Sequence, residues 1–405
     1  MYSKVGSNIL KCSSEIVRLQ IGELGENGDN VAYYDDEPIN VFGGIEGEEV
    51  LALIVPPVRR KSHHKKTAAF VTEVLTPSPY RVVPPCPYFG FCTGCQWQHI
   101  EYEHQLLLKG RCVAKQLRKF AELSAVKVAA TRPAPNSFGY RNHGRFTVRK
   151  NGVMGYINRL NRRFVPVDNC MLMDPWINNT LGVLQGKCEE TSQISIRYGV
   201  NTGEFLIQPT MHSKHVSIKT GQTHFQEKLF GERFRIASPS FFQVNTKQTE
   251  RMVNLVRERL NLQGHETIVD AYAGIGTFAI LLAPEAMRVI AVEESAAAVK
   301  DAIINAKGIN NLEYRQDKVE NVLGFLDCNI DALILDPPRV GCAEKVLREV
   351  VRRSPKKTIY ISCDPHTLAR DLRILANGGL SVQTVEPIDM FPQTHHVECI
   401  ATITS

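Results

Sequence analysis

The stretch "ETIVDAYAGIGTFA", residues 266–279, decides the fold that we expect for this chain. It begins as a short apolar run, turns at Gly274 and Gly276, and continues into residues of helical character. A strand that enters a helix through glycines lets a ligand approach the backbone at the helix N-terminus. The stretch therefore predicts a ligand-binding strand–turn–helix unit. It also satisfies the pattern GxGxxA, so a dinucleotide dehydrogenase is a rival interpretation.

The alternation of strand and helix continues toward the C-terminus. Apolar strand-like runs are "RVIAVE", "DALILDPPR" and "KTIYISCDP", and between them lie "TFAILLAPE", "ESAAAVKDAIINAKG", "EKVLREVVRRS" and "HTLARDLRILANGG". Continuous apolar strands separated by helices are typical of a doubly wound α/β sheet, in which helices bury both faces. Ligands bind such sheets at the carboxyl ends of the strands.

Carboxylates stand at several of these strand ends. Glu293 closes the strand after the glycine turn, where a carboxylate can bind both ribose hydroxyls. Asp317 and Asp336 end two further strands. So many acidic groups would repel a pyrophosphate and suit a cationic cofactor such as S-adenosylmethionine. This favours a methyltransferase, although Glu293 could also serve only as a helix cap.

A cysteine follows the next strand, in "YISCDP". Cys363 could be inert core filling, because free cysteine is often buried. At a strand end before a helix N-terminus, however, a thiol has a lowered pKa and can act as a nucleophile. In "DPPR", Arg339 replaces the aromatic residue that enzymes methylating exocyclic amines carry there, which disfavours an amine target.

Methylation of carbon 5 of uracil would use such a thiol. Carbon 5 becomes nucleophilic when a thiolate adds to carbon 6, and a base must later remove the carbon 5 proton. The segment "MFPQTHHVECIATI" offers three candidates for that base, namely His395, His396 and Glu398. The residues alone leave the choice among them open.

Composition places the chain among globular proteins that work in the cytosol. The 405 residues have no long apolar run or signal-peptide core, and an odd count of 11 cysteines speaks against a disulfide framework. The net charge of +6 is concentrated in two basic runs, residues 59–66 and 140–150. Such runs with interleaved aromatics favour RNA or DNA binding, with a solvated basic loop as the alternative.

The first half of the chain consists mainly of short strands. Strand-like runs between residues 14 and 80 fit a small barrel of the oligonucleotide-binding (OB) type, although any small antiparallel barrel would give the same pattern. A helix is expected at residues 101–122, and strands return at residues 138–210. Directly before the expected helix lies "CPYFGFCTGCQWQH", residues 86–99, whose three cysteines complete neither two disulfides nor a four-ligand metal site.

Taken together, these motifs resemble the RNA uracil-C5 methyltransferase family, in particular its iron-sulfur branch, which includes 23S rRNA (uracil-5-)-methyltransferases. The resemblance covers nearly the whole chain and is carried by "CPYFGFCTGCQWQH", "SFFQVN", "DAYAGIGTF", "DPPR", "SCDP" and "HHVE", in this order, after an N-terminal TRAM barrel. It implies Cys363 as the nucleophile and Glu398 as the base. It also implies that the following residues bind S-adenosylmethionine: Gln243, Tyr272, Glu293, Asp317 and Asp336.

The resemblance also implies a metal cofactor. In the family a fourth cysteine, here Cys170, joins the three clustered ones to hold a [4Fe-4S] cluster. The ligands would be Cys86, Cys92, Cys95 and Cys170. Spacing alone would equally permit structural zinc. One departure from the family bears on catalysis: Asp364 stands where an Asn is common, and a carboxylate beside the thiol could raise the pKa of Cys363.

The expected architecture is therefore a multidomain α/β protein: a TRAM or OB-like barrel at residues 1–77, a β-rich iron-sulfur and RNA-binding domain at 78–240, and a Rossmann-like class I methyltransferase domain at 241–405. The expected function is methylation of carbon 5 of one uridine in structured RNA, with 23S rRNA favoured and tRNA as the alternative. An NAD-linked oxidoreductase and a non-catalytic RNA-binding protein are the further alternatives. We expect a monomer with no membrane partner.

Overall fold

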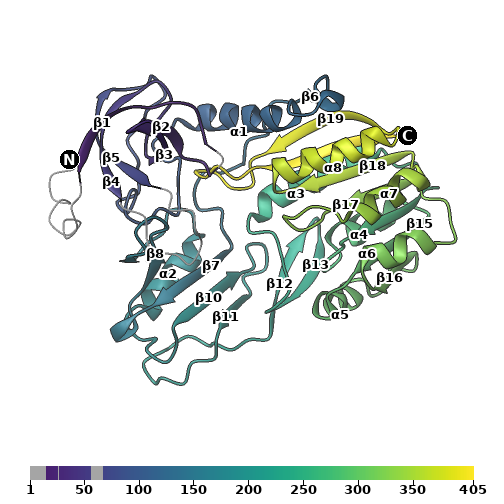
Figure 1. Cartoon of the computed structure of the whole chain (residues 1–405). Helices are drawn as coiled ribbons and strands as arrows, with labels where there is room; N and C mark the ends of the chain where they lie inside the picture. The colour runs from purple at the N-terminus through teal and green to yellow at the C-terminus, as the bar shows by residue number, and fades with distance from the viewer. Residues whose placement is uncertain (1–14, 26, 56–66) are drawn as a thin grey trace.

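The computed structural model describes residues 15–25, 27–55 and 67–405. The basic run at residues 59–66 and Cys12 lie outside the described residues. Along the described chain an N-terminal sheet, a central sheet, a hairpin and a large C-terminal sheet follow one another (Figure 1). None of the helices in these ranges combines the length and the apolar character that crossing a membrane requires.

The N-terminal sheet is formed by short strands in which apolar residues alternate with polar ones. Its strands are β1 (Ile16–Gln20), β2 (Asn30–Tyr34), β3 (Glu37–Phe42), β4 (Glu49–Val55) and β5 (Ala68–Thr76). Their order is β1-β4-β5-β3-β2, and the edge strands β1 and β2 contact each other. Alternation puts Leu19, Val41 and Val50 on one face, where they form a small separate core.

Helix α1 (Tyr102–Leu117) connects the cysteine segment to the rest of the chain. It ends five residues before the end of the helix expected at residues 101–122, and a short 3-10 turn at Ala121–Leu123 follows it. Val113 and Leu117 of α1 join the core of the C-terminal sheet, and α1 packs against α8 (Pro365–Asn377) (Figure 1). The helix is therefore part of the layer that covers this sheet.

The central sheet confirms the strands expected after residue 138. Its strands are β7 (His143–Val148), β8 (Met154–Ile157), β9 (Phe164–Pro166), β10 (Gln193–Tyr198) and β11 (Phe205–Gln208), in the order β11-β10-β7-β8-β9. Helix α2 (Pro175–Leu184) interrupts the expected run of strands. It forms there because the Asp174 side chain accepts the N–H of Trp176 and Pro175 occupies its first turn. A hairpin of β12 (His224–Leu229) and β13 (Glu232–Ala237) follows.

The C-terminal sheet is the doubly wound sheet that the sequence predicts. Its strands are β14 (Thr267–Ala271), β15 (Arg288–Glu293), β16 (Leu312–Gln316), β17 (Ala332–Leu335), β18 (Lys357–Ser362), β19 (Ser381–Ile388), β20 (Glu398–Thr404) and β6 (Lys127–Val128). The order is β16-β15-β14-β17-β18-β20-β19-β6. Strands β14 to β18 are parallel, whereas β20 runs antiparallel to both β18 and β19.

Helices bury both faces of this sheet. They are α3 (Thr246–Leu260), α4 (Thr277–Leu282), α5 (Ala296–Asn305), α6 (Val319–Val322), α7 (Glu344–Arg353) and α8. One core contains residues of α3 and α4, and the other contains residues of α1, α7 and α8. Because α1 and β6 come from the range 78–240, that range and the C-terminal sheet share a core. The domain boundaries stay a prediction.

Candidate active site

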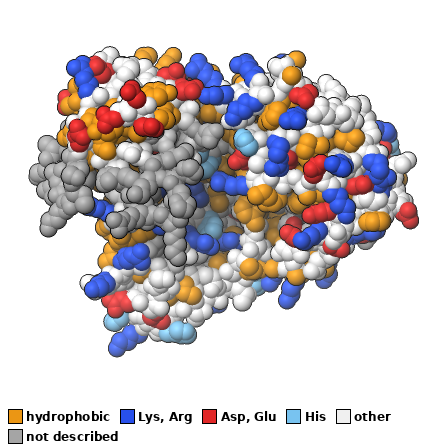
Figure 2. Space-filling model, in the orientation of Figure 1, with side chains coloured by type: hydrophobic (Ala, Val, Ile, Leu, Met, Phe, Trp, Pro, Cys, Tyr) orange, Lys and Arg blue, Asp and Glu red, His pale blue; other side chains and the backbone are white. Residues whose placement is uncertain are grey.

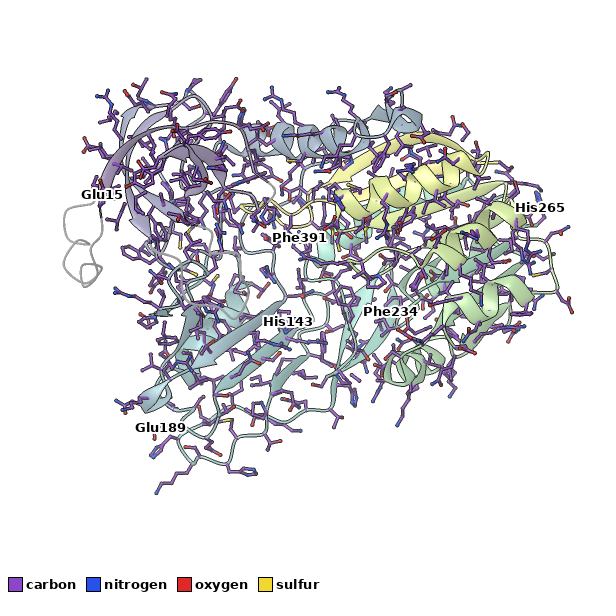
Figure 3. The ribbon with its side chains drawn as sticks, viewed as in Figure 1. Glu15, His143, Glu189, Phe234, His265 and Phe391 are labelled. Carbon is purple, nitrogen blue, oxygen red and sulfur yellow. The ribbon has the colours of Figure 1, made fainter. Side chains whose placement is uncertain are left out.

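A cavity of about 1040 Å³ opens at the carboxyl ends of the parallel strands. It brings together every residue that the sequence analysis assigned to catalysis or to cofactor binding: Gln243, Tyr272, Glu293, Asp317, Asp336, Cys363 and Glu398. Phe391, which also lines it, lies near the centre of the molecule in the segment before β20 (Figure 3). The cavity forms here because parallel strands present all their carboxyl ends at one edge of the sheet.

The glycine turn after β14 shapes one wall of this cavity. Gly276 begins α4 with a φ of 93°, and a Cβ there would come within 2.0 Å of the Tyr314 hydroxyl. Only glycine fits both constraints. The Gly274 N–H donates to Oε2 of Glu293 at 2.8 Å, and the Ser295 N–H donates to Oε1 at 2.8 Å. These bonds fix the Glu293 carboxylate at the end of β15.

Two carboxyl groups with raised pKa lie at this end of the sheet: Asp336 lines the cavity, whereas Asp270 is fully buried in β14. Burial raises the pKa of Asp336 to about 7. Burial, with the charge of Asp336, raises the pKa of Asp270 to about 8, and its Oδ2 accepts the Ala279 N–H at 2.9 Å. A bound cation would favour the ionised form of both groups. The sequence analysis did not single out Asp270, although "DAYAG" contains it.

Asp317 occupies a different environment at the outer rim. Its Oδ1 accepts the Asn321 side-chain amide at 2.8 Å and the Lys318 N–H at 2.7 Å. The bond from Asn321 lowers the pKa of Asp317, so this carboxylate is ionised at neutral pH. It can accept a hydrogen bond from a ligand at the mouth of the cavity.

Cys363 directly follows β18, and Glu398 is the first residue of the neighbouring strand β20. Ser362 pairs with Cys399 in the antiparallel β18–β20 ladder, which places the next residue of one strand opposite the preceding residue of the other. Burial and the Glu398 charge raise the pKa of the Cys363 thiol to about 11. Burial and Asp336 raise the pKa of Glu398 to about 8. A thiol and a carboxyl group therefore lie close enough for the charge of Glu398 to raise the pKa of Cys363, and both groups are mainly protonated at neutral pH.

Arg339 is a further candidate site residue, whose position the sequence analysis missed. It follows β17 and lines the cavity, and its guanidinium lowers the pKa of both Cys363 and Glu398. Its Nη2 also lies 3.4 Å from Nδ1 of His396. The motif "DPPR" was recognised, but only the missing aromatic residue was interpreted. The motif follows a strand of the same sheet, and this position could have indicated that Arg339 lies in the cavity.

The two histidines before Glu398 are held as neutral groups. Burial and nearby cations lower the pKa of His395 to about 3 and that of His396 to about 4. His395 packs against Gly28, in the loop before β2, where a Cβ would come within 2.3 Å of the imidazole ring. A histidine this far from its ordinary pKa is a poor proton acceptor at neutral pH. The lowered pKa values of the two histidines favour Glu398 among the three candidate bases.

Asp364 acts differently from the expectation that it would disturb the neighbouring thiol. Its Oδ1 accepts the N–H groups of His366 at 2.9 Å and Thr367 at 3.1 Å, so it caps α8. The pKa of Cys363 is indeed raised, but the causes are its burial and the charges of Glu398 and Asp336. The carboxylate is thus committed to the helix terminus.

The four cysteines assigned to a cluster line a second cavity of about 300 Å³: Cys86, Cys92, Cys95 and Cys170. All are free, and burial raises the pKa of Cys92 to about 11. Asn178 fixes the loop of Cys170, because its Oδ1 accepts the Cys170 N–H at 2.9 Å. Across residues 15–25, 27–55 and 67–405, however, no group of three or more His, Cys, Asp or Glu side chains is arranged to hold a metal ion. The cluster is therefore not shown.

Basic side chains surround this second cavity. Arg141, Arg145 and Arg159 line it together with the cysteines, and two of these arginines belong to the basic run at residues 140–150. On the face drawn in Figure 2, lysine, arginine and histidine side chains gather around the hollow in the middle of the molecule. Such a surface attracts a phosphate backbone.

Comparison of the amino-acid sequence with known proteins finds RNA methyltransferases, both by family model and by similarity to individual proteins. The family model described as "tRNA (Uracil-5-)-methyltransferase" matches residues 206–404. An uncharacterized RNA methyltransferase of Thermosynechococcus vestitus is 33% identical over 96% of this chain and 98% of its own length. One from Halalkalibacterium halodurans is 32% identical over 96% of this chain and 97% of its own length.

Among solved structures, the tRNA (uracil-54, C5)-methyltransferase of Pyrococcus abyssi, in complex with S-adenosyl-L-homocysteine, has a similar structure. The TM-score is 0.73 at 24% identity, covering 96% of this chain and 100% of the other. At this identity the similarity establishes the fold, which is that of a class I methyltransferase with mixed α/β content.

Proposed function

The chain belongs to the RNA uracil-5-methyltransferase family, and we propose that it transfers a methyl group from S-adenosylmethionine to carbon 5 of a uridine through a covalent adduct with Cys363. The observation that carries this proposal is that Cys363 and Glu398, which flank the Ser362–Cys399 pair at the end of the β18–β20 ladder, line one cavity together with strand-end carboxylates. The NAD-linked and non-catalytic alternatives are set aside because the relatives named above are RNA methyltransferases.

The cavity fits S-adenosylmethionine, which supplies a methyl group bound to a positively charged sulfur. Glu293, held by two backbone N–H groups, can bind the ribose hydroxyls. Burial raises the pKa of Asp336 and, with the charge of Asp336, that of Glu398, and a bound sulfonium would favour the ionised form of both groups. The cofactor product in the Pyrococcus abyssi structure supports the same cofactor here. Gln243, Tyr272 and Asp317 are proposed as further contacts.

In the proposed mechanism the Cys363 thiolate adds to carbon 6 of the uracil, and the electrons of the 5,6 double bond move into an enolate. Carbon 5 then takes the methyl group, and the carbon–sulfonium bond breaks. Glu398 removes the proton from carbon 5, and the bond between carbon 6 and Cys363 breaks to restore the double bond. Arg339 favours the ionised form of both side chains.

For the substrate we propose a uridine in a loop of structured RNA in the cytosol. The base must leave its stack to reach Cys363, which costs least where it is unpaired. The four cysteines favour 23S rRNA through the resemblance stated above. Transfer RNA is the second candidate, because the solved structure of similar fold is a tRNA methyltransferase. The basic surface around Arg141 and Arg145 would bind the phosphate backbone.

We also propose that the N-terminal sheet is the OB-like barrel of a TRAM domain. The order β1-β4-β5-β3-β2, with β1 and β2 in contact at its edges, is that of a five-stranded barrel of this type. The proposed domains are residues 1–77, 78–240 and 241–405. A barrel of this kind would extend the RNA-binding surface.

The function is tested with the purified protein, tritiated S-adenosylmethionine and RNA from cells that lack the gene. We expect 5-methyluridine in one RNA species, and mapping it by mass spectrometry separates rRNA from tRNA. With 5-fluorouridine RNA we expect a stable adduct through Cys363, because fluorine cannot leave carbon 5 as a proton does. Cofactor binding without either product would contradict the proposal.

The cysteine cavity is proposed to hold a [4Fe-4S] cluster on Cys86, Cys92, Cys95 and Cys170, with four thiolates as the donor set. We expect Cys170→Ser protein, purified without oxygen, to lose most of the iron and acid-labile sulfide of the wild type. Cys328→Ser is the control, because Cys328 lies outside this cavity. Zinc without sulfide in the wild type would indicate a structural zinc site instead and contradict the cluster.

A further inference from the structure

The segment that carries the proposed base is a connection between two strands. Residues 389–397, here called the base loop, join β19 to β20 and end immediately before Glu398. Ile388 pairs with Glu398 across the hairpin, so the loop leaves and re-enters the sheet at the same level. The path of the base loop therefore sets where β20 begins and where the Glu398 carboxylate points.

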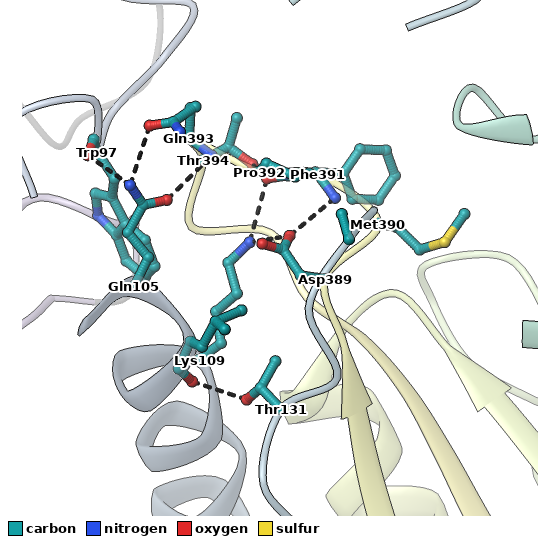
Figure 4. Close-up of polar contacts among 12 residues, drawn as sticks. Trp97, Gln105, Lys109, Thr131, Asp389, Met390, Phe391, Pro392, Gln393 and Thr394 are labelled. Carbon is teal, nitrogen blue, oxygen red and sulfur yellow. Dashed lines mark hydrogen bonds and ion pairs between the residues drawn. The ribbon is translucent and has the colours of Figure 1, made fainter. Parts of the chain in front are cut away.

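A buried ion pair ties the start of this loop to α1. Nζ of Lys109 lies 2.5 Å from Oδ1 of Asp389, and both side chains are fully buried. The same ammonium donates to the carbonyl of Phe391 at 3.2 Å, and Asp389 Oδ1 accepts the Phe391 N–H at 3.1 Å (Figure 4). Lys109 thus holds two positions of the loop from a helix that lies 280 residues away in sequence.

Further bonds fix the middle of the loop from the same side. The Gln393 N–H donates to Oε1 of Gln105 at 3.1 Å, and Nε2 of Gln105 donates to Oε1 of Gln393 at 3.0 Å (Figure 4). The Trp97 N–H donates to the Gln393 carbonyl at 3.1 Å, and the Tyr140 hydroxyl donates to the Pro392 carbonyl at 3.1 Å. The loop is held by the segment between residues 97 and 140.

Stability alone is a weak explanation for these contacts. Desolvation of a buried ion pair largely cancels its attraction, and well-packed apolar residues in its place are often as stable or more stable. What such a pair supplies is a defined geometry, because each partner must lie within hydrogen-bond distance of the other. The helix that provides this geometry also packs against α8, which begins two residues after Cys363. Helix α1 therefore contacts both the loop that precedes Glu398 and the helix that follows Cys363.

We propose that Lys109 and Gln105 are positioning residues, which hold the base loop so that Glu398 faces the covalent adduct on Cys363. The inference rests on the proposed function. Loosening the loop then slows removal of the carbon 5 proton, whereas addition of Cys363 and methyl transfer precede that step. The signature is a changed ratio between trapped adduct and released product.

The test is the double variant Lys109→Met, Asp389→Asn in the full chain. Replacing Lys109 alone would leave the buried Asp389 carboxylate without a cation, so both partners are replaced. The asparagine side chain introduced by Asp389→Asn can still accept the Phe391 N–H. RNA adduct on denaturing gels and 5-methyluridine are measured over time with ordinary uridine RNA. We expect product release to fall about 10- to 100-fold, the range that a misplaced catalytic group produces, while adduct forms within about threefold of the wild-type rate and accumulates.

Arg81→Met, Glu48→Gln is the matched control. It removes another ion pair with a buried carboxylate, one that makes no hydrogen bond to the base loop among the described residues. We expect it to leave the ratio of adduct to product unchanged. Equal loss of adduct and product in the Lys109 variant would overturn the inference. If that variant fails to fold, Tyr140→Phe, which removes one hydroxyl from Pro392, must shift the ratio in the same direction.

Glu398→Gln in the same assay separates this inference from the proposed function. If Glu398→Gln accumulates adduct and the Lys109 variant does not, the function stands and the positioning role is wrong. If wild-type protein forms no adduct even with 5-fluorouridine RNA, the covalent mechanism itself is wrong.

Discussion

Replacing Cys363 with alanine is expected to lower RNA methylation by about 10⁴-fold or more, the scale of losing a catalytic nucleophile. Carbon 5 of uracil cannot attack the methyl group until a thiolate has added to carbon 6. The variant should also form no adduct with 5-fluorouridine RNA. Mass spectrometry of 5-methyluridine, in RNA from cells that make only this variant, measures the loss.

The fold should tolerate this substitution. Cys363 is only partly buried and lies after the end of β18, so its replacement leaves the strand ladder intact. Cys328→Ala is the control, because Cys328 is also partly buried and lies outside the active-site cavity. Persistence of the same methylated uridine in cells with Cys363→Ala would rule out this nucleophile.

The sequence predicts the C-terminal sheet and the cavity well because both follow from local patterns. Glu293, Asp336 and Cys363 each stand at or just after the end of an apolar run. In a parallel sheet these ends converge, so one-dimensional spacing already places the residues together. This rule does not cover Glu398, because β20 is antiparallel and Glu398 is at its start. The sequence analysis therefore preferred Glu398 to its histidine neighbours only through the family resemblance.

Contacts between distant segments escaped this reasoning. Nothing in the run "HQLLLKGRC" marks Lys109 as the partner of Asp389, because a lysine in an amphipathic helix is normally solvated. The roles of Arg339 and of the loop around Gly28 likewise depend on which surfaces meet. The helix expected at residues 101–122 is present as α1, but nothing in its sequence indicated that it covers the C-terminal sheet.

The electrostatics of the cavity change during the proposed reaction. With the sulfonium present, positive charge favours the ionised forms of Cys363, Asp336 and Glu398. Methyl transfer leaves a neutral thioether in the cofactor product, so this charge disappears before the proton is removed. At that step the pKa of Glu398 should return toward the value of about 8 that burial and Asp336 impose.

Glu398→Gln is expected to lower product release by about 10²- to 10⁴-fold, the usual contribution of a general base, while the covalent RNA adduct still forms. Glutamine keeps the shape of the side chain but cannot accept the carbon 5 proton. Denaturing gels of the protein with uridine RNA should therefore show a persistent adduct. Loss of adduct together with product would contradict the assignment of Glu398 to the last step.

The pH dependence of the same step gives an independent measurement. Glu398 acts as a carboxylate, and a raised pKa means that it is largely protonated below about pH 8 once the sulfonium charge is gone. In wild-type protein, release of product from the pre-formed adduct should therefore accelerate as the pH rises toward about 8 and then level off. In Glu398→Gln the residual release should lack this rise, because the titrating group has been removed. A wild-type rate that is flat across this range would mean that another group takes the proton.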